Sequence, residues 1–462
     1  MTSPGAPSVA DLTGSERRAE QRAWYFYDWA NSAYVTTIAT VLFAPYLTVV
    51  AERAACGPGR SDDSPCRTDL SVLGVSVSPG SLIFYVVTLA TVLSAVILPI
   101  VGAIADRSSS KKHLMAGFAW AGSAFAACMF FVTGGNWQLG AVLLVAANLC
   151  LGGSLVVYNA IMMEISSPDE RDRVSSRGWA LGYLGGGLLL AVNLALVTLH
   201  DSLGLSQALA VRICLLMAAV WWAAFTIIPF RGIRNRPATG VAAAPGGMVR
   251  QSFGQLWTTL RHMRAYPMTL LFLGAYLFYN DGIQTVIVSA STYGEKELGF
   301  ETSVLIATIL LVQFVAFLGA LLFGRIAHRL GSKKTILGGL VVWMIVVMIA
   351  YVLPEESLLP FLGMAVLIGI VLGGTQALSR SFFSQLVPKG REAEYFSLYE
   401  ACERGTSWLG TLVFGLMHQW LDSYRPAIVA LLVFFVVGMV LLSRVDARRG
   451  IADAGNAAPA MV

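Results

Sequence analysis

Long stretches without Asp, Glu, Lys or Arg divide the chain into apolar segments of helical length. They span residues 29–51, 70–105, 114–163, 178–200, 213–230, 265–280, 302–324, 335–354, 357–379, 405–421 and 426–443. A helix needs about 20 apolar residues to cross a bilayer. The stretch 114–163 is long enough for two crossings, with a turn predicted at Gly134-Gly135-Asn136. The pattern therefore predicts twelve transmembrane helices.

The shortest of these stretches, 265–280, predicts a charge inside the membrane. It reaches the length of a crossing only if the helix includes Asp281 and continues to about Tyr293. A carboxylate at that depth costs at least a few kcal/mol, so such residues are usually functional. Asp281 is therefore predicted to be a substrate or proton site.

Composition supports the bilayer as the solvent of this chain. Only 13% of the 462 residues are charged, against about 25% in soluble domains. Of the 32 Lys and Arg residues, 25 lie in the termini and every second loop, six lie on the opposite side, and Arg404 lies inside a predicted helix. Because cytoplasmic loops hold the excess of Lys and Arg, we expect both termini to lie in the cytoplasm. We expect the protein itself to lie in the plasma membrane. The net charge of +5 is then a topology signal, and no nucleic-acid partner is expected.

An internal repeat relates the two halves of the chain. A shift of 222 aligns the segment 102–112 (GAIADRSSSKK) with 324–334 (GRIAHRLGSKK), and a shift of 221 aligns 151–154 with 372–375. The expected organisation is a cytoplasmic tail 1–23, a six-helix bundle 24–230, a cytoplasmic linker 231–266, a second six-helix bundle 267–443 and a cytoplasmic tail 444–462. Within the linker, Phe253 to Met263 has apolar residues at helical spacing and is predicted to lie along the membrane surface.

These features resemble the major facilitator superfamily of secondary transporters. The resemblance rests on two six-helix halves, a basic linker, and the signature Gly-x-x-x-Asp-Arg-x-x-x-Lys-Lys after the second helix. Four further motifs are similar to the vacuole-effluxer branch of that superfamily, whose members are autophagy-related amino-acid effluxers: 25–34 (YFYDWANSAY), 178–187 (GWALGYLGGG), 279–285 (YNDGIQT) and 373–381 (GGTQALSRS). The resemblance implies an all-α integral membrane fold of twelve helices in two pseudo-symmetric bundles, and a role in amino-acid export.

The resemblance also implies a gate at the signature. Asp106 is expected to hold the cytoplasmic side closed against the start of the predicted helix that contains the stretch 405–421, with Arg107 and the following lysines at the lipid surface. A plain topology-setting turn is the alternative. In the second copy His328 stands where the acid should be, which predicts a weaker or pH-dependent contact there.

Asp28 is the residue we expect to couple transport to protons. It lies in the first helix among aromatic residues, and Asn31 follows on the same helical face. The alternative is an interfacial residue surrounded by an aromatic belt.

Charged residues near the cytoplasmic ends of three predicted helices predict gating contacts. These helices contain the later part of 114–163, the stretch 357–379 and the stretch 405–421. Glu400 and Arg404 have the spacing of an ion pair within one helix, whereas Glu403 has no such partner. Glu164 and Arg380 are expected to pair across the two halves and to separate when access alternates.

Polar residues within the apolar helices predict the binding cavity. The candidates for substrate or proton binding are Asp28, Asn31, Tyr34, Asn159, Tyr183, Tyr279, Asn280, Asp281, Gln284 and Gln376. Carboxylates, amides and phenols suit a small zwitterion. The expected function is secondary active transport of amino acids or short peptides by alternating access with proton coupling, by a monomer in the bilayer. The alternatives are an exporter of hydrophobic or amphipathic compounds, and a receptor or scaffold that does not transport.

Other chemistry finds little support in the sequence. It has no phosphate-binding Gly-x-x-x-x-Gly-Lys-Ser/Thr loop and no His or Cys at metal-ligand spacing, so neither an enzyme nor a cofactor or metal is expected. Residues 1–23 lack the apolar core of a secretory signal. Cys56 and Cys66 flank the longest external loop; they form either a disulfide or two unpaired thiols.

Overall fold

The computed structural model describes residues 13–57, 66, 68–72, 74–237, 261, 263–405, 409–410, 412–414, 416–417 and 424–461. The predicted surface helix at Phe253 to Met263 lies almost wholly outside these residues.

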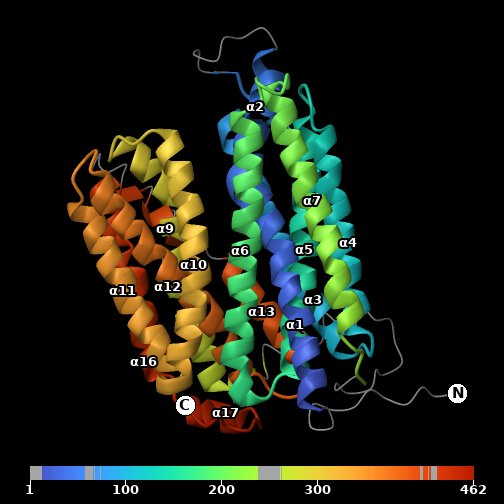
Figure 1. The fold of residues 1–462 in the computed structure, drawn as a ribbon. Coiled ribbons are helices and arrows are strands. Elements are labelled where there is room, and N and C mark those ends of the chain that lie inside the picture. Colours follow the sequence, from blue (N-terminus) through green and yellow to red (C-terminus); the bar gives the residue numbers. More distant parts are fainter. Residues whose placement is uncertain are drawn as a thin grey trace, which may run out of the picture.

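The described chain is almost entirely helical (Figure 1). In the first half the elements are α1 (Gly14–Ala33), the π-helix η1 (Tyr34–Leu42), α2 (Phe43–Cys56), β1 (Leu70–Val72), β2 (Val75–Val77), the 3₁₀ turn η2 (Pro79–Ser81), α3 (Leu82–Asp106), α4 (Lys111–Cys128), η3 (Met129–Phe131), α5 (Trp137–Ile165), η4 (Pro168–Glu170), α6 (Arg171–Thr198) and α7 (Gln207–Gly232). In the second half they are η5 (Met263–Ala265), α9 (Pro267–Lys296), α10 (Thr302–Leu330), α11 (Ser332–Val352), α12 (Leu358–Leu386), α13 (Glu392–Gly405), α15 (Tyr424–Ala430), α16 (Leu432–Arg444) and α17 (Ala447–Asp453).

Eleven helical segments of the described chain are long and apolar enough to span a membrane. The turn predicted inside 114–163 is present, because Gly134 has a positive φ of 58° and α5 begins at Trp137. The helix predicted over 405–421 is not among the eleven, since α13 ends at Gly405 and several of the residues that follow lie outside the described part.

The helices form two bundles, α1 to α7 and α9 to α16 (Figure 1). We call the end of the molecule where α1 begins and α17 lies the terminal face. The opposite end, which carries the two-stranded β1–β2 hairpin, is the loop face. In the hairpin Leu70 pairs with Val77 in antiparallel register.

The first transmembrane segment changes helix type near its middle. η1 is a π-helix of nine residues, six of them β-branched, and such residues restrict side-chain rotamers in an α-helix. Here α1 and η1 pack against the glycine-rich part of α6, where a Cβ at Gly186 would lie 2.5 Å from the Thr36 hydroxyl. Asn193 of α6 also donates a 2.8 Å hydrogen bond to Thr37. Glycine in α6 thus lets the wider π-helical segment fit.

The two bundles touch each other from the terminal face to about mid-depth. The contacts nearest the loop face among the described hydrogen bonds join Gln313 of α10 to Thr36, at 3.2 Å, and the carbonyl of Arg404 to Thr91 of α3, at 3.5 Å. Towards the terminal face α6 packs on α10 and α12, and α13 packs on α3 and α5. The described contacts therefore hold the terminal face closed.

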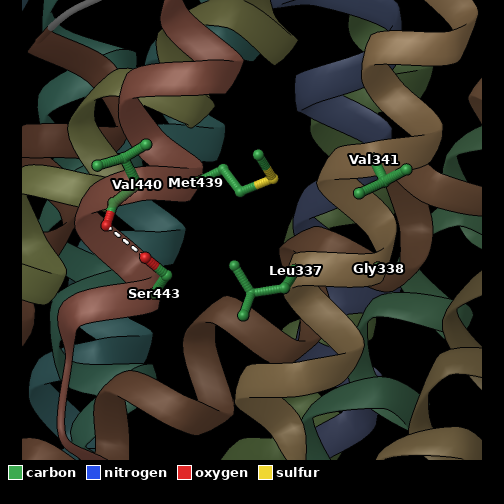
Figure 2. A pocket seen from close by; sticks show the side chains of 6 residues that line it. All are labelled: Leu337, Gly338, Val341, Met439, Val440 and Ser443. Atoms are coloured by element: carbon green, nitrogen blue, oxygen red, sulfur yellow. Dashed lines mark hydrogen bonds between the residues drawn. The ribbon is translucent and has the colours of Figure 1, made fainter.

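An apolar groove of about 350 Å³ lies on the outside of the second bundle (Figure 2). It is lined by residues of α11 and α16: Leu337, Gly338, Val341, Met439, Val440 and Ser443. Val341 and Val440 are more than 40% exposed, so the groove faces outward and is separate from the interface between the bundles.

Candidate functional site

Arg380 of α12 reaches from the second bundle into the first. Its side chain is 3% exposed and forms an ion pair with Asp28 of α1, with 3.0 Å between Nη2 and Oδ2. Its Nε donates to the Ser175 hydroxyl and its Nη2 to the Ser175 carbonyl, each at 2.9 Å. One buried guanidinium thus binds two helices of the opposite bundle.

Aromatic rings surround the same guanidinium. Its centre lies 5.0 Å from the ring of Trp24, 5.4 Å from Trp179 and 5.5 Å from Tyr158, within the range of cation–π attraction. Glycine is required beside the pair, because a Cβ at Gly178 would lie 2.5 Å from Asp28 Oδ2. These contacts offset part of the cost of burying both charges.

The predicted pairing of Glu164 with Arg380 is wrong. Glu164 forms an ion pair with Lys111 inside the first bundle. Glu164 lies one residue before the end of α5, whereas Arg380 lies six residues before the end of α12, which places Arg380 about 7.5 Å deeper at 1.5 Å per residue. The difference in depth separates the two side chains, and Asp28 takes the place of Glu164.

A second contact between the bundles involves Glu400 of α13. Asn159 of α5 donates a 2.9 Å hydrogen bond to Glu400 Oε1, and Arg404 lies 3.4 Å from Oε2. The predicted ion pair of Glu400 with Arg404 is therefore present. Glu403 is half-buried, and its backbone carbonyl accepts a hydrogen bond from Asn280. Acidic and basic groups thus lie side by side at mid-depth, beside α5.

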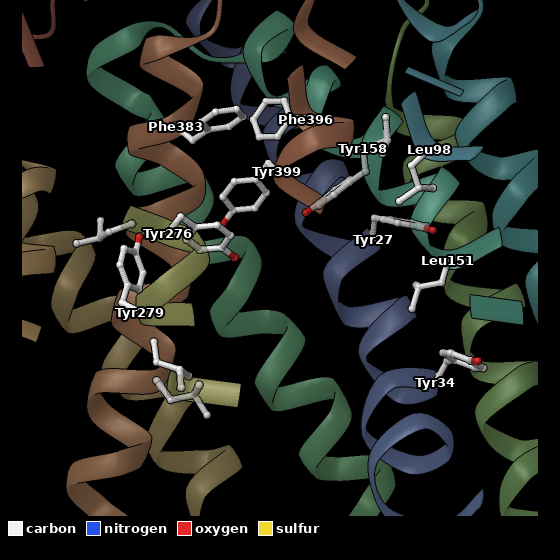
Figure 3. Close-up of a cluster of buried hydrophobic side chains, with 14 of the residues drawn as sticks. Tyr27, Tyr34, Leu98, Leu151, Tyr158, Tyr276, Tyr279, Phe383, Phe396 and Tyr399 are labelled. Atoms are coloured by element: carbon white, nitrogen blue, oxygen red, sulfur yellow. The ribbon is translucent and has the colours of Figure 1, made fainter. Parts of the chain in front are cut away.

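Within the second bundle, a chain of buried polar groups continues from Glu403 to α9 and α12. Gln376 donates to Asn280 at 2.9 Å and accepts from the Tyr276 hydroxyl at 3.4 Å. Tyr279 bonds to Ser379 at 2.6 Å. Figure 3 shows Tyr276 and Tyr279 on the side of Tyr399, and Tyr27 and Tyr158 on the other side of the interface. The phenolic oxygens of Tyr27, Tyr158 and Tyr399 have no hydrogen-bond partner among the described residues.

Asp106 lies at the start of α13, as predicted. Its two carboxylate oxygens accept hydrogen bonds from the backbone N–H groups of Ala393 and Glu394, at 2.8 and 2.9 Å. A carboxylate at a helix N-terminus satisfies free N–H groups and complements the helix dipole. Arg107 follows it, half-buried at the terminal face.

The second copy of the signature makes its contact differently. At the start of α6 Asp172 accepts hydrogen bonds from Ser332, at 2.8 Å, and Ser381, at 2.6 Å. The neighbouring Arg171 donates to the Ser384 carbonyl at 2.9 Å. The second copy has His328 in place of the acid, and the carboxylate comes instead from the helix that faces it. Our reading of the sequence missed Arg171, Asp172 and Ser175. The signal available in the sequence was the position of this acid at the start of α6, which corresponds in the internal repeat to α13.

Two predicted binding residues make their hydrogen bonds within the first bundle. Asn31 donates to the carbonyl of Tyr27 in its own helix, and Tyr34 donates to Asn148 within the first bundle. Gln284 of α9 is half-buried. Tyr183 lies at the interface, because its ring is 5.6 Å from that of Trp179, which contacts Arg380.

Asp281 and the cysteines complete the predicted set. Asp281 is buried inside the second bundle, where Gly410 donates to it. Cys56 and Cys66 form a disulfide at the loop face. The described residues hold no group of three or more His, Cys, Asp or Glu that could bind a metal ion.

Comparisons with known proteins agree on the type of molecule. Residues 16–455 match the family model described as "Vacuole effluxer Atg22 like". The chain is 30% identical over 426 residues to an uncharacterized MFS-type transporter, YxiO, of Bacillus subtilis, covering 92% of this chain and 94% of the relative. It is 26% identical to autophagy-related protein 22-2 of Emericella nidulans, covering 83% and 80%.

Solved structures share the fold at low sequence identity. The proton:xylose symporter XylE has a TM-score of 0.67 at 12% identity, covering 94% of this chain and 95% of the symporter. A bacterial homologue of the iron transporter ferroportin, in an outward-facing state, has a TM-score of 0.65 at 14% identity, covering 93% and 98%.

Proposed function

Because the chain belongs to the vacuole-effluxer (Atg22-like) family of major facilitator transporters, we propose that it moves small polar solutes, amino acids or short peptides, by alternating access. The observation that carries the proposal is the set of buried charges between the bundles. Glu400 and Arg404 at mid-depth offer a carboxylate and a guanidinium within a few ångströms of each other, and a zwitterion needs one partner of each sign.

The contacts at the terminal face supply the gate in this proposal. Asp106 on α13, Arg380 on Asp28, and Asp172 on Ser332 and Ser381 all join one bundle to the other. They must separate before a solute can leave through the terminal face. Asp106 and Arg380 therefore act as locks, and Asp28 serves the Arg380 lock, because both of its carboxylate oxygens bond to that guanidinium. An exporter of hydrophobic compounds would not need buried charges at mid-depth.

A solute-induced thermal shift tests the substrate class. The purified chain is heated with each member of a panel of amino acids, peptides, sugars and apolar dyes, at about pH 5.5 and about pH 7.5 to detect linkage to protons. A zwitterion should raise the unfolding temperature of the wild type, and Glu400→Gln should lose that shift. Glu295→Gln is the control, because Glu295 is an exposed residue of α9 paired with Lys296. Stabilisation by apolar dyes alone would overturn the proposal.

We also propose that the terminal face is cytoplasmic and that the protein lies in the plasma membrane. Two observations support this orientation: the excess of Lys and Arg at the terminal face and the Cys56–Cys66 disulfide at the loop face, which suits an oxidising compartment.

Cysteine labelling in whole cells tests the orientation. Single cysteines are placed at Asp201, between α6 and α7, and at Ser109, between α3 and α4, both exposed. The background keeps the disulfide and lacks the four cysteines outside it. A membrane-impermeant maleimide should label Asp201→Cys in intact cells and Ser109→Cys only after permeabilisation. The reverse pattern would show the opposite orientation.

A further inference from the structure

Asp281 is a buried carboxylate without a counter-charge. It lies near the middle of α9, a helix of 30 residues, and is 1% exposed. Its Oδ2 accepts a 2.9 Å hydrogen bond from the backbone N–H of Gly410. Its Oδ1 has no hydrogen-bond partner among the described residues, and neither does the hydroxyl of Thr285, one turn further along α9 and fully buried.

The two unpartnered oxygens lie at the same place in the fold. A Cβ at Gly410 would lie 3.2 Å from Asp281 Oδ1 and would collide with the Thr285 hydroxyl. Asp281, Thr285 and Gly410 therefore converge on one point inside the second bundle. Only glycine fits at position 410 without displacing the other two.

The charged groups around α9 have other partners or lie far along their helices. On α13 Glu400 pairs with Arg404, and Glu403 touches α9 through its carbonyl. On α12 Arg380 pairs with Asp28, and on α16 Phe434 and Phe435 face the neighbouring Gly282. The remaining titratable groups lie on the same element or on those packed against it: Tyr276, Tyr279, Tyr293, Glu295 and Lys296 of α9, Glu392, Glu394, Tyr395, Tyr399 and Cys402 of α13, Arg264 of η5, Glu301 just before α10, Arg325, His328 and Arg329 near its end, Arg444 of α16, and Arg448, Arg449 and Asp453 of α17. Within the described chain no ion pair involves Asp281.

One proton supplies what the site lacks. An ionised carboxylate buried without a partner is so costly that such groups take up a proton instead. A proton on Oδ1 neutralises the charge. The Thr285 hydroxyl can pair with Oδ1 in either state, as donor to a carboxylate or as acceptor from the acid, so it is the missing counter-charge that calls for the proton. A metal ion fits less well, because hard cations need about six oxygen ligands.

We propose that Asp281 is the proton-binding site of this transporter, and that it holds a proton shared with Thr285 while the terminal face is closed. This inference rests on the proposed function and names its coupling group. Once the proton is lost, the carboxylate needs further donors, which favours a shift of the chain around Gly410. Gly410 follows α13 by five residues, and α13 carries the contacts of Asp106 and Glu400. Proton loss at Asp281 would thus act on the helix that closes the terminal face.

Infrared difference spectroscopy of the purified full chain tests the assignment. The carbonyl stretch of a protonated carboxylic acid is separate from that of a carboxylate, so titration from acid to alkaline pH should show a band that Asp281→Asn removes. Asp106→Asn is the matched control, since Asp106 is equally buried but bonded through both oxygens, and it should keep the band. Thr285→Val, which removes the hydroxyl at nearly constant volume, should keep the band and shift it to higher wavenumber.

The outcomes separate this inference from the proposed function. A spectrum that Asp281→Asn leaves unchanged, or a Thr285→Val band at the wild-type position, would overturn the inference even if a zwitterion stabilises the protein. Loss of the band on addition of Na⁺ would also overturn it, because the site would then bind a metal ion. The band does not depend on any solute, so a chain that binds no zwitterion would contradict the proposed function and leave this test intact.

Discussion

The guanidinium of Arg380 bonds to α1 and α6 of the opposite bundle and lies over the ring of Tyr158 in α5. Removing one partner of a buried pair leaves an uncompensated charge. Both Asp28 and Arg380 were predicted as site residues from the sequence. Their pairing was not predicted, because they are 352 positions apart in the chain and local spacing carries no information about such a contact. Local spacing did predict the pair of Glu400 and Arg404, which lie one helical turn apart.

A double-mutant cycle tests the pair of Asp28 and Arg380. Asp28→Asn and Arg380→Gln should each destabilise the protein by about 3–5 kcal/mol, and the double variant should lose less than the sum because no buried charge remains. Unfolding temperatures of the purified variants measure this coupling. Arg380→Lys should not restore stability, because an ammonium cannot make the forked bonds to Asp28 and Ser175. Additive losses would show that the two side chains do not interact.

At the scale of elements, the signature glycines mark where helices of the two bundles cross. A Cβ at Gly102 of α3 would lie 2.5 Å from the carbonyl oxygen of Ala393, and one at Gly324 of α10 would lie 2.6 Å from the Ser176 hydroxyl. The internal repeat predicted that these two positions are related. The repeat could not predict that in the second copy the carboxylate belongs to Asp172 of the facing helix α6, because Asp172 lies outside the aligned segment.

A larger side chain at Gly102 tests whether the close contact of α3 with α13 stabilises the protein. Gly102→Leu should destabilise the protein by about 1–3 kcal/mol, as overpacking of a tight contact does, and should lower its unfolding temperature. Gly117→Leu on α4 is the control, because a Cβ there would meet no atom within 4 Å. Equal effects of the two substitutions would show that Gly102 is an ordinary helix position and not the closest approach of α3 and α13.

At the scale of the whole molecule, charge-free stretches were enough to predict most of the helices, because the cost of burying a charge in lipid acts on each segment separately. Contacts between bundles depend on depth and side-chain direction, and the failed pairing of Glu164 with Arg380 shows that limit. The C-terminal tail was also not foreseen as part of the structure. Asn456 donates to the carbonyls of Gln385 and Val387, and the N–H of Ala460 bonds to Asp169 of the first bundle, so the tail ties both bundles together at the terminal face.

The central claim is that locks between the bundles hold the terminal face closed. Distances between spin labels test this claim most directly. One pair, at Ser109 and Lys389, spans the two bundles at the terminal face; the other, at Asp201 and Glu355, spans them at the loop face, and all four positions are exposed. Double electron–electron resonance on the purified chain should show that Arg380→Gln populates longer terminal-face distances and shorter loop-face distances than the wild type. Unchanged distributions at both faces would contradict the account.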